Sequence, residues 1–121
     1  MMEYAIGADP EFLRVLVEGR DTDVAPSALC AQVFAESERL ERPRILIELD
    51  QKFPLSLRSQ QQLMEELPRI GFTAQHSIAM VHRTPVAQMA NQYIDMFAAA
   101  RELTVRNFRD VEQAKEWLRS R

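Results

Sequence analysis

Apolar and polar residues alternate in two runs near the amino terminus, at residues 3–8 and 11–19. Asp9 and Pro10 separate the runs, and this pair is typical of turns. A period of two places the apolar side chains of a strand on one face. The pattern therefore predicts an amino-terminal β-hairpin.

A helical period follows the hairpin. We expect the first helix to begin at Asp23, which can serve as its N-cap, and to end at the Glu-Arg-Pro sequence of residues 41–43. Its apolar positions are Leu29, Val33, Phe34 and Leu40.

A compact apolar strand is expected at residues 44–50, and a second amphipathic helix begins near Ser56 and ends around Pro68 and Gly71. This helix carries Leu63, Met64, Leu67 and Ile70. The pattern predicts a strand–helix unit.

The next unit is a strand at residues 77–82, followed by Thr84 as N-cap and Pro85 in the first turn of a third helix, which runs to about Ala99. We expect its buried stripe to consist of Val86, Met89, Ala90, Tyr93 and Phe97. These residues are typical of a packed core.

The last unit is a short strand at residues 103–105 and a fourth helix. Asp110 and Gln113 have the spacing of a capping box at its start. Its apolar residues are Val111, Ala114, Trp117 and Leu118.

The element order is ββαβαβαβα, which predicts one α/β domain over residues 1–121. The hairpin pairs antiparallel, and the later strands add in parallel through right-handed crossovers, giving a mixed, mostly parallel sheet packed with four helices.

Strands that helices bury on both faces are nearly continuous apolar runs, whereas polar residues interrupt the strands of this chain with a period of two. These residues are Arg14, Glu18, Glu48 and Ser77. One sheet face should therefore be only partly covered, and we expect it to carry Phe12, Leu16, Leu46, Ala79 and Val81. Such a face could bind a partner or a second copy of the chain.

Composition limits the classes of function. The net charge of −3 and the pI near 5.4 leave no excess of cations for phosphates, so nucleic acid is not an expected partner. No segment has the pattern of a membrane span or a signal peptide, and we expect a cytoplasmic protein. Cys30 is the only cysteine, and we interpret it as a small buried hydrophobic residue.

Several segments together resemble the SpoIIAA-like family, bacterial relatives of the STAS domains and of lipid-carrying domains. They are the hairpin, Ile45–Asp50, Ile78–Val81 leading into Thr84-Pro85, and the terminal Val105–Leu118 with its Phe-Arg-Asp…Ala…Trp-Leu pattern. The likeness covers nearly the whole chain in element order. It implies the SpoIIAA/STAS-like fold, but most members of the family are uncharacterised.

In the STAS regulators, a serine in an Asp-Ser-Ser-Gly-Leu-Gly turn at the second helix is phosphorylated by a partner kinase. Here Ser56 or Ser59 lies near that place, but the acidic residue and the glycines are missing. The sequence therefore argues against a kinase switch. The lipid-carrying relatives are larger, and the apolar content of this chain is what one core would use.

No cofactor or metal site is expected. His76 and His82 lie at the two ends of one strand, about 20 Å apart at about 3.3 Å per residue, so they cannot share one metal ion. Gly7, Gly19 and Gly71 are isolated, which excludes glycine-rich phosphate loops.

The carboxyl ends of the parallel strands are the candidate ligand site, because open α/β sheets bind ligands there. The residues expected at this edge are Asp50, Ser56, Ser59, His82, Arg83, Thr84 and Asn107. An anion could bind at a helix N-terminus beside Arg83. In the alternative interpretation, Ser56 and Thr84 cap helices, Asp50 and Asn107 shape loops, and His82 is solvated.

Three functional hypotheses follow. The first is a non-enzymatic binding or regulatory domain that acts through protein contacts and forms a homodimer. The second is a carrier of a small ligand, a lipid or an acyl chain. The third is an enzyme that uses His82 and Arg83 on an anionic substrate.

Overall fold

A computed structural model of the chain describes residues 2–8, 10–19, 26–51, 57–82 and 93–121. It has the predicted element order. The predicted caps Asp23 and Thr84, the turn residue Asp9, and the start of the third helix at residues 85–92 lie outside the described residues.

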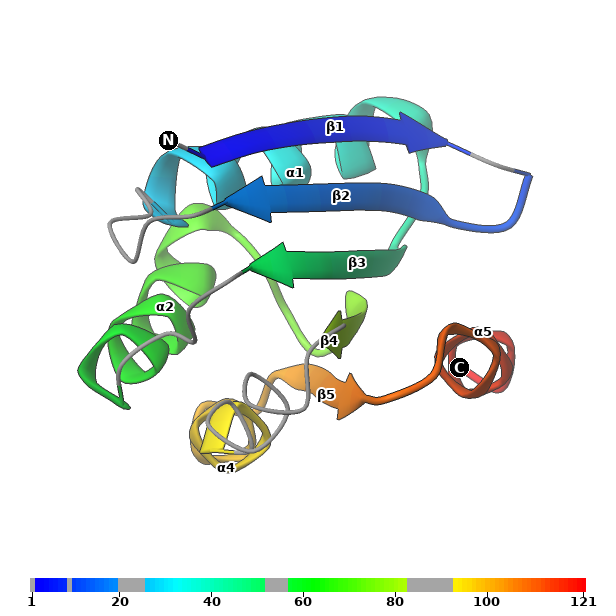
Figure 1. Cartoon of the computed structure of the whole chain (residues 1–121). Coiled ribbons are helices and arrows are strands. Elements are labelled where there is room, and N and C mark those ends of the chain that lie inside the picture. Colours follow the sequence, from blue (N-terminus) through cyan, green and yellow to red (C-terminus); the bar gives the residue numbers. More distant parts are fainter. Residues whose placement is uncertain (1, 9, 20–25, 52–56, 83–92) are drawn as a thin grey trace.

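The strands form one five-stranded sheet in which the strand order equals the chain order (Figure 1). Its strands are β1 (Met2–Ala8), β2 (Leu13–Gly19), β3 (Arg44–Gln51), β4 (Ser77–His82) and β5 (Thr104–Phe108). β1 pairs antiparallel with β2, and all later neighbours pair in parallel. The prediction of a hairpin followed by a mostly parallel sheet is confirmed.

The four described helices divide unequally between the two faces of the sheet. They are α1 (Pro26–Leu40), α2 (Leu57–Ile70), α4 (Tyr93–Ala100) and α5 (Val111–Arg119). The first three connect successive parallel strands, and right-handed connections that advance in one direction place their helices on the same face. α5 packs on the opposite face.

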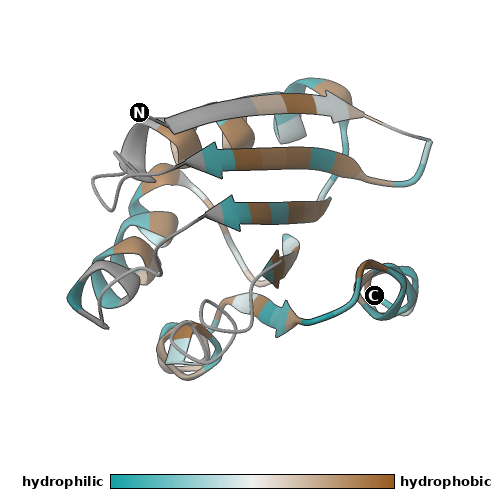
Figure 2. Ribbon diagram, in the orientation of Figure 1, coloured by the Kyte–Doolittle hydropathy of each residue, from teal (hydrophilic) through white to brown (hydrophobic). Residues whose placement is uncertain are grey.

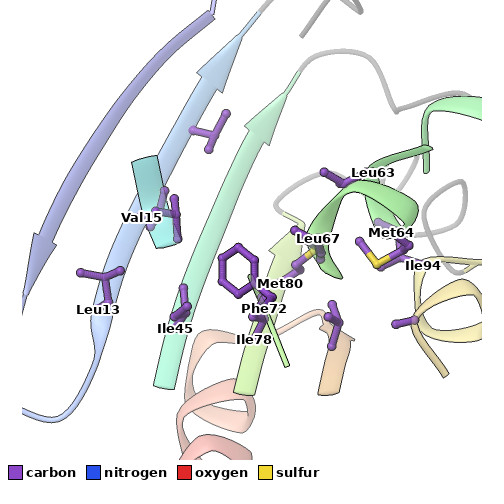
Figure 3. Close-up of a cluster of buried hydrophobic side chains, with 14 residues drawn as sticks. Leu13, Val15, Ile45, Leu63, Met64, Leu67, Phe72, Ile78, Met80 and Ile94 are labelled. Carbon is purple, nitrogen blue, oxygen red and sulfur yellow. The ribbon is translucent and has the colours of Figure 1, made fainter. Parts of the chain in front are cut away.

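The larger core fills the face under α1, α2 and α4. Alternate residues of the parallel strands point into it, including Leu13, Val15 and Val17 of β2. Figure 3 shows Leu13 and Val15 of β2 in one cluster with Leu63, Met64 and Leu67 of α2 and Ile94 of α4, with Ile45, Phe72 and Met80 between them. The helical period of α2 is therefore confirmed as a buried stripe.

The smaller core lies under α5 on the opposite face. Its buried members are Phe12, Leu46, Ala79, Val81, Ala114 and Leu118. Four of the five residues expected on a partly covered face are among them. The fifth, Leu16, points to the same face of the sheet and is half-buried.

The alternation of apolar and polar residues along β2 and β3 is visible in Figure 2.

Two sequence expectations need correction. β5 extends to Phe108 rather than ending at Val105, because Arg106 and Asn107 are polar and hide the continuation of the strand. In the third helix the buried residues are Ile94 and Ala98, whereas Tyr93 is 42% exposed. The apolar stripe is thus shifted by one residue from its predicted position.

Gly71 ends α2 in a conformation that other residues rarely adopt. Its φ is +133°, and a Cβ atom built there would lie 2.6 Å from the Phe34 ring of α1. The N–H groups of Gly71 and Phe72 both donate to the carbonyl of Leu67, which closes the helix. Glycine therefore brings α1 and α2 into close contact as well as ending the helix.

No helix in the described residues is both long and apolar enough to cross a membrane.

The N-cap of α5 provides a test of how the second core is held. The Asp110 side chain accepts the Glu112 N–H at 2.9 Å. We expect Asp110→Ala to lower the free energy of unfolding by about 1 kcal/mol, because it removes this acceptor. Asp110→Asn keeps an acceptor and should cost only a few tenths of that. Urea titration would measure both, and equal losses would contradict the capping role.

Candidate functional site

Three of the seven residues expected at this edge can be placed as side chains. Ser56, Arg83 and Thr84 lie outside the described residues, and for Ser59 only the backbone in α2 is described. Asp50 and His82 lie at the carboxyl ends of β3 and β4, and Asn107 lies in β5.

Asp50 and His82 point to opposite faces of the sheet. His82 pairs in register with Leu49, and parallel partners share a face, so His82 points toward the larger core. Asp50 follows Leu49 directly and therefore points to the face that carries α5. The structure does not bring these two residues into one site.

His82 is buried rather than solvated, which corrects the alternative interpretation of this residue. His82 is only 1% exposed. It donates Nε2–H to Oδ1 of Asn107 at 2.7 Å. Asn107 is a residue of β5 and not of a loop, and it donates both Nδ2–H and its backbone N–H to Oδ1 of Asp95 at 3.0 and 2.9 Å.

This chain of hydrogen bonds fixes the protonation of the imidazole. Because the Asn107 amide nitrogen faces a carboxylate, its oxygen must face His82, and His82 carries its proton on Nε2. Burial lowers the pKa of His82, against the opposing effect of the Asn107 hydrogen bond. The network therefore ties β4, β5 and α4 together around a neutral imidazole.

Asp95, the third member of the network, has a raised pKa. Burial is the main cause, and it outweighs the hydrogen bonds from Asn107 and the positive charge of Arg106, which act in the opposite direction. Sequence reasoning did not select Asp95, because nothing in its local pattern distinguishes it from any other acidic residue on a helix.

The described structure contains an apolar cavity of about 60 Å³ between the sheet and α1 and α2. Almost no polar surface faces it. Residues of β2, β3 and β4 form one wall, and the others come from α1, α2, α4 and the segment after α2. The lining residues are Val15, Val17, Leu29, Cys30, Val33, Ile47, Leu49, Leu63, Leu67, Phe72, Ile78, Met80 and Ile94.

Cys30 is the one lining residue with reactive chemistry, and its surroundings suppress that chemistry. Burial, and secondarily the negative charge of Glu66, raises the pKa of the Cys30 thiol to about 12. The thiol is thus neutral at physiological pH. Cys30 is half-buried rather than fully buried as expected, and it forms part of the cavity wall.

The described residues offer no metal centre, because no three His, Cys, Asp or Glu side chains among them are grouped closely enough to hold an ion.

Comparisons with known proteins gave no match: neither a protein-family model, nor a curated protein, nor a solved structure matches this chain. The functional interpretation therefore depends on the geometry of the cavity and of the sheet.

The burial of His82 predicts a loss of stability in acid. Its pKa is lowered from 6.5, so the unfolded chain binds the proton more readily, and the free energy of unfolding falls as the pH drops below about 6.5. The raised pKa of Asp95 has the opposite effect, because the folded protein binds this proton more readily than the unfolded chain. It raises the free energy of unfolding as the pH falls, at pH values above about 3.8. We expect His82→Gln, which keeps a donor for Asn107, to flatten the dependence between pH 7 and 5 in urea titrations.

The matched control is His76→Gln, which removes the other histidine and leaves His82 in place. This variant should keep the acid loss that His82 causes. An unchanged slope in His82→Gln would contradict the assignment.

Proposed function

We propose that this protein is a non-enzymatic binding domain whose ligand is a small apolar molecule or an acyl chain. The apolar cavity between the sheet and α1 and α2 is the observation that carries this proposal. Its walls offer dispersion contacts and almost no hydrogen-bonding groups, so it selects for hydrocarbon. The enzyme hypothesis has less support, because the His82 imidazole is buried and its Nε2–H is bonded to Asn107.

The size of the cavity limits what it can hold. An apolar cavity of about 150 Å³ accepts benzene in another protein, whereas this one has about 60 Å³. A narrow group of roughly three carbons fits, such as the end of an acyl chain. Burial contributes about 0.8 kcal/mol per methylene, so roughly 2 kcal/mol of affinity would come from the group inside the cavity. Contacts of the rest of the ligand outside the cavity must supply the remainder that co-purification requires.

The lipid-carrying relatives of the SpoIIAA-like family bind apolar molecules, but they are larger than this chain, so we propose that only a short apolar group enters the cavity. We propose the same SpoIIAA/STAS-like fold and a cytoplasmic location for this chain.

Native mass spectrometry of freshly purified full-length protein tests the proposal. We expect a co-purifying mass in the wild type and its reduction in Val33→Ile, because the added methylene occupies the cavity. The same variant should raise the free energy of unfolding by up to about 1 kcal/mol, since it fills empty apolar space.

The control is Val81→Ile, which adds the same methylene to the packed core under α5, outside the cavity. Overpacking there should cost about 1–3 kcal/mol and leave the co-purifying mass in place. A bare chain mass in the wild type, or an equal loss of stability in both variants, would overturn the proposal.

A second candidate function is protein contact through the half of the α5 face that lies over β1 and β2, here called the open face. At Gly7 of β1, a Cβ atom would meet nothing within 4 Å among the described residues. Ala5 is exposed and Leu16 is half-buried. On the same face, Arg14 forms an ion pair with Glu48 at 2.6 Å. Small and apolar residues around one charged pair suit a second copy of the chain.

We expect size-exclusion chromatography with light scattering to show a dimer at micromolar concentration that Leu16→Glu converts to monomer, because the substitution places a charge in the interface. Met96→Glu changes an equally apolar residue that is 56% exposed on α4, on the other side of the sheet, and should leave the dimer intact. A monomeric wild type at high micromolar concentration would remove this candidate.

A further inference from the structure

A groove runs along the free edge of β5, the last strand of the sheet. It has a volume of about 270 Å³ and is lined by Asp95 and Ala99 of α4, by Leu103–Arg106, and by Trp117 and Arg121. Successive residues of a strand point to opposite faces, so a groove that touches four consecutive residues must follow the backbone edge. We call it the β5 groove.

The backbone of β5 has unpaired groups at the floor of the groove, at Val105, a residue that is 7% exposed and lines it. Asn107 donates its N–H to Asp95 and not to β4, so Asn107 faces the edge. Residues of a parallel strand alternate in the direction of their backbone groups, and Val105 therefore also presents its N–H and carbonyl to the groove. Among the described residues, neither the N–H nor the carbonyl of Val105 forms a hydrogen bond to a loop, a helix or a side chain.

Two arginine side chains lie on the α5 side of the groove, because Arg106 pairs in register with Ala79 of the core under α5 and Arg121 stacks on Trp117 of α5. The Arg121 guanidinium carbon lies 5.3 Å from the centre of the Trp117 ring, and that of Arg106 lies 5.5 Å from the centre of the Phe108 ring. Neither guanidinium lies within 4.0 Å of a described carboxylate, and the charge of Arg106 acts on Asp95 only at longer range. Stacking on the rings holds them in place, which lowers the entropy lost when they bind an anion.

We propose that the β5 groove binds an extended acidic segment of a partner protein, which adds to β5 as a sixth strand. The segment pairs with the free Val105 backbone, and alternate carboxylates reach Arg106 and Arg121 on the α5 side. Asp95 covers the Asn107 N–H and is itself acidic, so pairing ends there. The acidic residues of the segment therefore lie on the α5 side of the groove, away from Asp95 of α4.

The probe is the peptide acetyl-Val-Glu-Val-Glu-Val-amide, titrated into the ¹⁵N-labelled full chain and followed by NMR. We expect saturable shifts and slower hydrogen exchange at the Val105 amide, and weaker binding at high salt. Arg106→Gln and Arg121→Gln should each weaken binding by about threefold, as expected for partly exposed ion pairs. The control Arg58→Gln, an exposed arginine on α2, should leave the affinity unchanged.

Three further probes separate strand addition from simple charge attraction. The lysine peptide acetyl-Val-Lys-Val-Lys-Val-amide should not bind, and methylation of the central backbone nitrogen of the acidic peptide should weaken it at least fivefold, on the order of one lost hydrogen bond. Glutarate should leave the Val105 exchange rate unchanged. Equal binding of the lysine peptide, equal protection by glutarate, or no effect of the acidic peptide at Val105 would each overturn the proposal.

Discussion

The equality of strand order and chain order is the constraint on which the rest of the structure depends. Each parallel strand joins the sheet beside its predecessor, so every right-handed crossover leaves its helix on the same side. One face therefore receives α1, α2 and α4, and the other is left to α5. The apolar cavity under α1 and α2, the open face over β1 and the free edge at β5 all follow from this unequal distribution.

Local periodicity was enough to predict the elements and most of the core, because an apolar face must match the period of its own strand or helix. It placed Phe12, Leu46, Ala79 and Val81 on one face before α5 was known to cover them. The shifted stripe of α4 shows the limit of this reasoning. A stripe with several apolar neighbours allows two helical phases, and packing against β5 and α2 buried Ile94 rather than Tyr93.

The candidate site was less predictable, because its properties arise between elements. The burial of His82 depends on Asn107 and Asp95, which lie on β5 and α4 and are distant in sequence. Asp50 and His82 lie near the carboxyl ends of neighbouring strands, but alternate residues of a strand point to opposite faces, so their side chains lie on different faces of the sheet. The cavity arises because the side chains that line it do not fill the space between the sheet and the helices, although each of them is an ordinary core residue. No composition or spacing signals such a mismatch.

The position of α5 on the face opposite the other helices has a consequence for the order of assembly during folding. The larger core is complete once β5 has joined the sheet, but Leu46 and Ala79 stay uncovered on the other face until α5 docks. A chain in which the larger core forms first thus exposes an apolar sheet surface. Slower docking of α5 would lengthen that stage, and a chaperone bound to the uncovered face would protect it.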